Sequence, residues 1–115
     1  MTEQRLDPLI LAELKELLEE EFPELIATFI RDAQQRLELL ALAIETDDVS
    51  NTRMAAHSLK GSSSNIGFAQ FAQLCHEVEE AAKALQLDSC RALLPALVVE
   101  AEWVLDQLEV MISES

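Results

Sequence analysis

Hydrophobic positions recur at alternating spacings of four and three residues along most of the chain. The clearest stripe lies between residues 23 and 46, and it consists of Ile26, Ile30, Ala33, Leu37, Leu40 and Ile44. This spacing places the apolar side chains on one face of an α-helix, as in the seam of an antiparallel bundle. The pattern therefore predicts a long amphipathic helix over residues 23–46.

The N-terminal part of the chain predicts a shorter helix over residues 7–20. Asp7 followed by Pro8 combines an N-cap residue with a proline at the first helical position. Phe22-Pro23 then ends this helix, because a proline fits poorly inside a helix but can open the next one. The apolar side chains expected on its packing face are Leu9, Ile10, Leu14, Leu17 and Leu18.

Two helices of intermediate length are predicted next, over residues 48–65 and 68–86. Asp47-Asp48 supplies a turn and a cap before the first, and Asn65-Ile66-Gly67 a stop and a tight turn after it. The packing face of the helix over 48–65 reads Ala55, Leu59, Ser62 and Ile66. The stripe of the helix over 68–86 reads Phe68, Phe71, Cys75, Val78, Ala82 and Leu85.

The last helix is predicted over residues 88–112, after a turn and cap at Leu87-Asp88-Ser89. We expect Pro95 either to kink this helix or to mark its true start. The residues of its inner stripe are Leu94, Val98, Ala101, Leu105, Leu108 and Ile112. Because Val99, Trp103 and Val110 fall on the opposite face, we expect residues 6–22 to shield Trp103 partly. A homodimer seam on that face is the alternative.

Short connections between these helices favour antiparallel neighbours. We therefore predict an all-α fold, an antiparallel up-down four-helix bundle with an additional short N-terminal helix, in a single domain over residues 1–115. With 50% hydrophobic residues, 2 glycines and 3 prolines, the chain has the composition of a helical core with few loops.

Composition also limits the function and the compartment. The formal net charge of −14 argues against binding to a nucleic-acid backbone. No stretch is apolar for the ~18 residues of a membrane span, and the N-terminus lacks the apolar core of a signal peptide. Cys75 and Cys90 are expected to be buried small hydrophobes and not a disulfide framework. We expect a cytoplasmic protein that does not associate with membranes.

The candidate chemistry centres on His57. Arg53, Lys60, Gly61 and Ser64 lie at offsets of −4, +3, +4 and +7 from it. At about 100° per residue, these offsets place all four within about 60° of His57 on one helix face. Gly61 gains nothing in packing on an exposed face, so it suggests close approach of a partner to the backbone; the alternative is that Gly61 and the serines simply end the helix.

Acidic residues are absent from Val49 to His76, although Asp and Glu number 22 in the chain. A carboxylate beside His57 would favour the imidazolium and repel an incoming anion, so we interpret the gap as the chain keeping carboxylates away from His57. Lys60, one turn away, would attract a phosphoryl group. The acidic runs Glu19-Glu20-Glu21 and Glu77-Glu79-Glu80 are expected to be solvated helix faces.

The segment Ala56-His57-Ser58-Leu59-Lys60-Gly61-Ser62-Ser63, followed by Asn65-Ile66-Gly67, resembles the signature of histidine-containing phosphotransfer (HPt) domains. Leu74-Cys75 and Glu79 continue the pattern of that family, and the helical pattern extends the match over nearly the whole chain. The resemblance implies a four-helix bundle that passes phosphoryl groups between receiver-domain aspartates in multistep two-component phosphorelays.

The resemblance implies that His57 is the phosphoacceptor, reacting through Nε2, and that Mg²⁺ and the acidic cluster belong to the partner receiver. We expect Lys60 to stabilise the phosphoryl group, although it could also be an ordinary solvated lysine. Gly61 is expected to leave room for the partner, and Arg53 and Ser64 to support the site; Ser64 could instead only cap the helix. Metal binding by His76 and Cys75 is not expected, since zinc needs about four convergent ligands.

The protein is therefore expected to be a phosphocarrier with no ATP site and no cofactor of its own. The expected partners are receiver domains of response regulators and hybrid sensor kinases, and the expected state is a monomer. The alternative is a non-catalytic helical adaptor with a decayed or coincidental histidine motif. Met1 and the early first helix favour a free-standing protein over a domain cut from a hybrid kinase.

Overall fold

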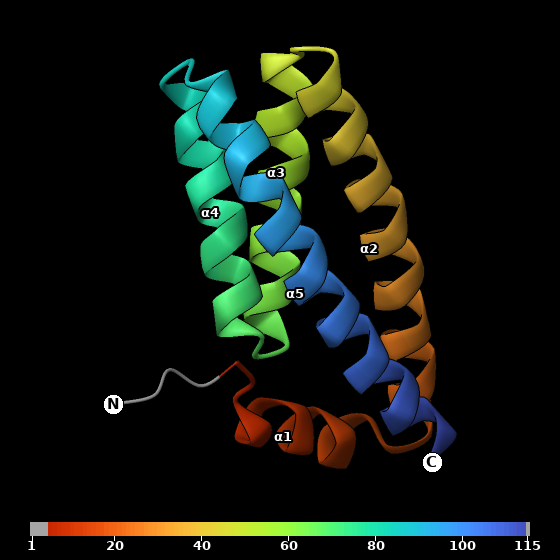
Figure 1. Cartoon of the computed structure of the whole chain (residues 1–115). Helices are drawn as coiled ribbons and strands as arrows, with labels where there is room; N and C mark the ends of the chain where they lie inside the picture. Colours follow the sequence, from red (N-terminus) through yellow and green to blue (C-terminus); the bar gives the residue numbers. More distant parts are fainter. Residues whose placement is uncertain (1–4, 115) are drawn as a thin grey trace.

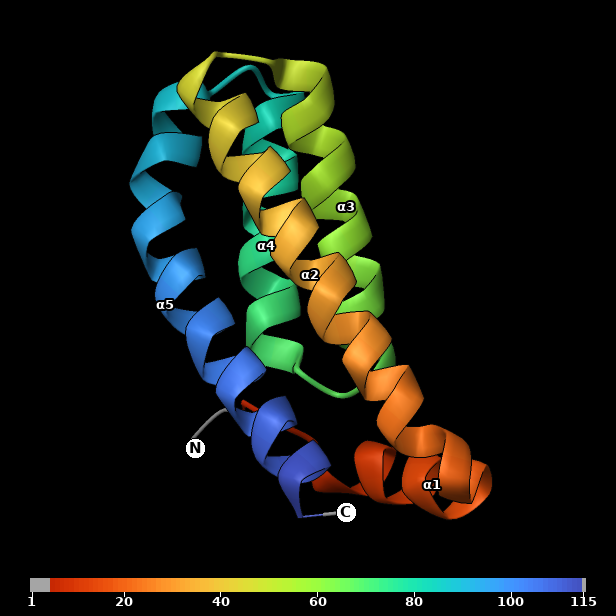
Figure 2. The same ribbon diagram turned by 90° about the vertical axis from the view of Figure 1, so that its right-hand side faces the viewer.

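The computed structural model describes residues 5–114, and in this range it contains five α-helices and no strand. The helices are α1 (Pro8–Leu18), α2 (Phe22–Glu45), α3 (Val49–Asn65), α4 (Ala69–Lys83) and α5 (Leu87–Ser113), with a short 3-10 helix, η1 (Glu19–Glu21), between α1 and α2. Figures 1 and 2 show that α2 to α5 run alternately up and down side by side. The prediction of an antiparallel four-helix bundle with an additional N-terminal helix is confirmed.

The four bundle helices form a closed ring, in which α3 packs between α2 and α4, and α5 packs between α4 and α2. The helices differ in length: α2 has 24 residues and α5 has 27, whereas α3 has 17 and α4 has 15. At 1.5 Å per residue, α2 is about 10 Å longer than α3, and α5 is about 18 Å longer than α4. In Figure 1, α1 lies across one end of the bundle.

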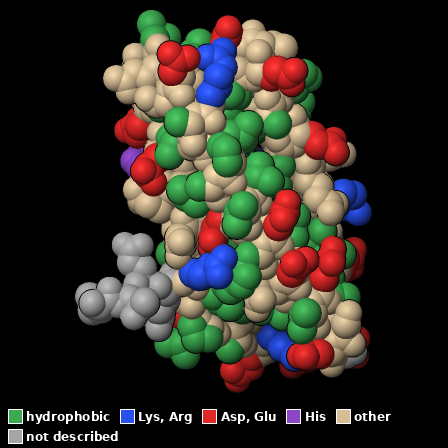
Figure 3. All heavy atoms as spheres, in the orientation of Figure 1, with side chains coloured by type: hydrophobic (Ala, Val, Ile, Leu, Met, Phe, Trp, Pro, Cys, Tyr) green, Lys and Arg blue, Asp and Glu red, His purple; other side chains and the backbone are tan. Residues whose placement is uncertain are grey.

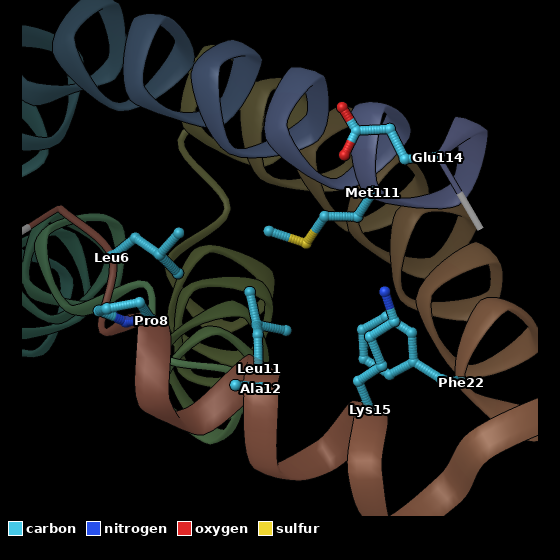
Figure 4. Close-up of a pocket in the computed structure, with 8 residues that line it drawn as sticks. All are labelled: Leu6, Pro8, Leu11, Ala12, Lys15, Phe22, Met111 and Glu114. Carbon is cyan, nitrogen blue, oxygen red and sulfur yellow. The ribbon is translucent and has the colours of Figure 1, made fainter.

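Helix α1 closes the end of the bundle with a face that differs from the predicted one. Leu11 is buried, and Leu14 and Leu18 are partly buried against the core, whereas Leu9 and Leu17 are exposed. The expectation that Leu9 and Leu17 pack is wrong, because α1 lies across the end of the bundle and only one narrow stripe reaches the core. An apolar cavity of about 230 Å³ remains between α1 and the end of α5, as Figure 4 shows.

The N-terminal segment is attached to the turn that follows α3. The backbone N–H of Asp7 donates to the carbonyl of Gly67 at 2.8 Å, and the Asp7 side chain caps α1 by accepting from the N–H of Leu9 at 3.0 Å. Gly67 has φ +90°, and a Cβ there would lie 3.0 Å from the Asp7 carbonyl oxygen. Glycine is therefore required both for the predicted tight turn and for this close approach.

The predicted stripes of α2, α3 and α4 largely form the core. In α2, Ile26, Ala33, Leu40 and Ile44 are buried, and Ile30 and Leu37 pack partly buried against them. In α3, Ala55 and Leu59 are buried and Ser62 is half-buried, and Ile66, which follows the last residue of α3, is also buried. The α4 stripe is confirmed from Phe68 to Ala82, but Leu85 is exposed. Leu85 lies beyond the end of α4, in a turn where its φ is +59°.

The stripe predicted for α5 is partly wrong. Val98 is exposed, and the buried seam instead consists of Cys90, Leu97, Ala101, Val104 and Leu108. The helix begins at Leu87 and runs without a break through Pro95, so Pro95 is not its start. Pro95 is exposed, so the helical hydrogen bond that it removes is on the solvent side. Asp88 lies in the first turn and is not the cap.

Trp103 is half-buried, but its ring contacts come from Arg5 and Phe68, which lie outside residues 6–22, so the predicted shielding by that segment is not shown. The Arg5 guanidinium lies 3.8 Å from the Trp103 ring centroid, and Phe68 meets the ring edge-on at 5.9 Å between centroids. Val99 and Val110 are exposed, so the expectation that α1 covers a second apolar side of α5 is wrong for these residues. Figure 3 shows hydrophobic side chains on this face with acidic side chains among them.

Among the helices of residues 5–114, none is both long enough and apolar enough to cross a membrane.

Candidate functional site

His57 lies on the outer face of α3, opposite the buried residues Ala55 and Leu59. Its side chain is 68% exposed. The Asp48 side chain caps α3 by accepting from the N–H of Asn51 at 3.0 Å, which fixes the start of the helix and therefore its register. Helix α3 contains no Asp or Glu.

The described structure nevertheless places a carboxylate directly against His57. Nδ1 of His57 lies 2.9 Å from Oε2 of Glu79, a residue of α4. Nζ of Lys60 donates to the other oxygen of Glu79, Oε1, at 2.6 Å. Glu79 is only 5% exposed. The interpretation of Glu79 as part of a solvated face is therefore wrong, and so is the idea that the chain keeps carboxylates away from His57.

Glu79 is buried because of its position on α4. It follows Cys75 by four residues and precedes Ala82 by three, so it falls within the apolar stripe of the helix. This stripe packs against α3, which carries His57 and Lys60. The sequence signal for a buried Glu79 is its position inside an apolar stripe. That signal was missed because Glu79 was grouped with the exposed Glu77 and Glu80.

Glu79 is ionised, and its charge is balanced locally. Burial alone raises the pKa of Glu79, but hydrogen bonds from Lys60 and His57 lower it by more, so the pKa lies below its ordinary value of 4.5. The ammonium of Lys60 offsets the carboxylate charge, which reduces the repulsion that an isolated carboxylate would exert on an anion. Because an ionised carboxylate only accepts, the shared proton belongs to Nδ1 of His57.

The other predicted residues occupy the same face of α3. Gly61 is exposed, and a Cβ added there would meet no atom within 4 Å. Arg53 and Ser64 are also exposed. Within residues 5–114, neither side chain forms a hydrogen bond or an ion pair, although the Ser64 carbonyl accepts from the N–H of Gly67 at 3.1 Å. The structure therefore brings His57 and Lys60 together through Glu79, with Gly61 beside them.

Lys83 is a further charged residue at this site that the sequence reasoning did not identify. Its Nζ lies 3.7 Å from Oε2 of Glu79, the oxygen that faces His57. The spacing of four residues from Glu79 is a signal for such a helical pair.

The second histidine, His76, is 4.0 Å from Glu80 and half-buried, and Cys75 is buried. Burial raises the pKa of Cys75 to about 12, so its thiol is protonated. Within the described part of the chain, no three His, Cys, Asp or Glu side chains come together as metal ligands would.

Comparison with known proteins identifies the family. The model of the Hpt domain family matches residues 24–114, so the chain belongs to the Hpt family. It is 28% identical over 106 residues to histidine-containing phosphotransfer protein 2 of Arabidopsis thaliana, covering 86% of this chain and 68% of that protein. The crystal structure of histidine-containing phosphotransfer protein B (HptB) from Pseudomonas aeruginosa PAO1 superposes with a TM-score of 0.93 at 34% identity, over 99% of both chains. Members of this family are phosphocarriers with a histidine phosphotransfer role in phosphorelays.

Proposed function

We propose that His57 accepts a phosphoryl group from the aspartyl phosphate of one receiver domain and passes it to the aspartate of another. The observation that carries this proposal is the orientation of the ring. Nδ1 is bonded to the buried Glu79, while the side chain is 68% exposed, so Nε2, on the far side of the ring, is the nitrogen available to a partner. Family membership supports the same role.

The transfer step follows from this arrangement. The lone pair of Nε2 forms a bond to phosphorus, the bond from phosphorus to the aspartate oxygen breaks, and the partner aspartate leaves as a carboxylate. The proton on Nδ1 stays in place, so the ring gains positive charge as the new bond forms. The ionised Glu79, 2.9 Å away, stabilises that charge. Donation to a second receiver is the reverse of this step.

Lys60 is proposed to stabilise the transferred phosphoryl group. Its ammonium carries three donors, and one of them already holds Oε1 of Glu79. The side chain is 28% exposed and is therefore accessible from the His57 face. Arg53 and Ser64, exposed on the same face, are proposed to contact the partner or the phosphoryl group.

The surface around His57 supports a protein partner. Leu39 of α2 and Met54 of α3, each more than half exposed, line a shallow groove with Ser58, the neighbour of His57. Leu42 of α2, also more than half exposed, lines a second groove that shares Leu39. Exposed apolar side chains gathered on one face are typical of protein contact sites. We propose that receiver domains of response regulators and hybrid sensor kinases dock here. The receiver contributes Mg²⁺, which its own acidic residues bind. This protein acts as a monomer in the cytoplasm.

The test is incubation with separately phosphorylated receiver domains. The proposal predicts that the chain acquires acid-labile, alkali-stable phosphate and that a second, unphosphorylated receiver removes it. A helical adaptor would bind receivers without gaining phosphate, and that result would overturn the proposal.

A further inference from the structure

Glu79 has a second lysine partner besides Lys60. Nζ of Lys83 lies 3.7 Å from Oε2 of Glu79 and 3.4 Å from Oε2 of Glu80. Glu79 is buried, whereas the side chains of Lys83 and Glu80 are 46% and 51% exposed. The ammonium of Lys83 therefore lies between a buried and an exposed carboxylate. A small movement of its side chain would bring it into closer contact with one of the two.

The charges around Glu79 balance before phosphorylation. Glu79 and Glu80 contribute two negative charges, and Lys60 and Lys83 two positive ones; His76, 4.0 Å from Glu80, is the other titratable group beside them. If His57 is phosphorylated as proposed above, the phosphoryl group adds about −1.5 to −2 charges. Lys60, one turn from His57, is then drawn toward the phosphoryl oxygens. Glu79 would lose its closest counter-ion while still buried, which is costly.

We infer that Lys83 is a positioning residue, which replaces Lys60 as the counter-ion of Glu79 when His57 carries a phosphoryl group. The inference rests on the proposed function of His57. Lys83 holds the carboxylate on Nδ1 and also offsets its charge. A carboxylate paired in this way favours protonation of the ring less than an unpaired carboxylate does.

This exchange affects the lifetime of the phosphohistidine. In hydrolysis, a water oxygen bonds to phosphorus, the bond from phosphorus to Nε2 breaks, and its electron pair returns to Nε2. A ring that keeps a proton on Nδ1 leaves as neutral imidazole, which is a better leaving group than an imidazolate anion. With Lys83 beside it, Glu79 favours this proton less strongly, so Lys83 slows the loss of phosphate to water by lowering the fraction of phosphohistidine that is protonated on Nδ1.

The test needs no partner protein, because potassium phosphoramidate phosphorylates histidine directly. In a His76→Gln background only His57 remains as a histidine acceptor. The lifetime of its phosphate is followed by ³¹P NMR across a pH series, with and without the further change Lys83→Met. The expected result for Lys83→Met is a lifetime at neutral pH shorter by about three- to fivefold, the effect that one partly exposed ion pair supports. The profile of hydrolysis rate against pH should also move to higher pH.

Two further variants serve as controls. Lys83→Arg keeps the positive charge and should restore the parent lifetime, whereas Glu80→Gln removes only the exposed partner and should not shorten it. An unchanged lifetime and pH profile in Lys83→Met would overturn the inference while leaving the proposed function intact. Failure of receivers to exchange phosphate with His57 would overturn the proposed function. The phosphoramidate experiment would still test the role of Lys83, because it needs no receiver. Failure of phosphoramidate to label His57 would overturn both.

Discussion

Glu79 holds His57 and Lys60 with different oxygens of one carboxylate, Oε2 at 2.9 Å from Nδ1 and Oε1 at 2.6 Å from Nζ. The pair is joined across two helices, since His57 and Lys60 belong to α3 and Glu79 to α4. One buried side chain thus sets both the tautomer of the histidine and the position of the lysine.

Glu79→Gln tests the importance of this charge. The amide oxygen of glutamine can still accept from Nδ1, but its NH₂ group then faces the ammonium of Lys60. We expect phosphoryl transfer from a receiver to slow by about tenfold, the effect of losing about 1.5 kcal/mol of a charge-assisted hydrogen bond in the transition state. Single-turnover transfer rates measure it. Glu80→Gln removes the same charge from the exposed neighbour, and equal rates in both variants would contradict the role of Glu79.

The same carboxylate should make stability depend on pH. The folded-state pKa of Glu79 is below its ordinary value of 4.5, so its contribution to folding is present above that value. The contribution is lost as pH falls through the lowered pKa. Urea unfolding of the parent and of Glu79→Gln should therefore differ by about 1 kcal/mol at pH 7, and the difference should shrink below pH ~4.5. A difference that stays constant down to pH 3 would contradict this assignment.

Gly61 should matter for partner approach and not for folding. A Cβ at Gly61 meets no atom within 4 Å, so Gly61→Ala should fold and gain up to ~1 kcal/mol from helix propensity. Gly61→Glu should fold equally well but block transfer, because its side chain occupies the space beside His57 and carries a negative charge. Thermal unfolding and transfer assays on both variants separate the two effects. Parent-rate transfer by Gly61→Glu would show that no partner approaches the backbone here.

Arg5 should shield the Trp103 ring from solvent and stabilise the buried charge of Glu100. Its guanidinium covers the Trp103 ring and donates three hydrogen bonds to the buried carboxylate of Glu100, two from Nε at 3.1 and 3.2 Å and one from Nη2 at 2.8 Å. Arg5→Ala should lower the melting temperature and red-shift the emission of Trp103, which is the only tryptophan. Glu100→Gln combined with Arg5→Ala should lose less stability than the two single variants together. Strict additivity and an unshifted spectrum would show that the pair does not couple.

The sequence predicted helix positions well where apolar periodicity and caps agreed. Asp7, Asp48 and Gly67 mark helix ends in the structure much as their residue types indicated. The stripe of α5 was less reliable, because valine and leucine occur all around that helix and periodicity cannot choose among them. The exposed Val98 and the buried Leu97 illustrate this, since only contact with α2 and α4 distinguishes them.

Only the part of the site that lies on a single helix, α3, was predicted from the sequence. The face with His57, Lys60 and Gly61 followed from spacing along α3, whereas the contact with Glu79 depends on how α4 packs against α3. Two buried acids, Glu79 and Glu100, lie among the buried apolar residues of α4 and α5 and were not predicted. Their partners come from other helices or from the N-terminal segment, which a single-helix pattern does not reveal.

His57 should be the only residue phosphorylated by a receiver. His57→Gln should keep the helical circular dichroism signal and abolish phosphate uptake, because it removes the exposed nucleophile and leaves the α3–α4 contact otherwise intact. His76→Gln should transfer at the parent rate, since His76 pairs only with the exposed Glu80 among the described residues. Normal uptake by His57→Gln would contradict the assignment of the acceptor.

The central claim is that Nε2 of His57 accepts the phosphoryl group while Nδ1 keeps its proton against Glu79. Two-dimensional ¹H–¹⁵N NMR of the ¹⁵N-labelled chain, recorded before and after phosphorylation by a receiver, tests it most directly through nitrogen–phosphorus coupling in the imidazole ring. The account predicts coupling to Nε2 of His57, with the signal of a protonated Nδ1 retained. Coupling to Nδ1, or to either ring nitrogen of His76, would contradict it.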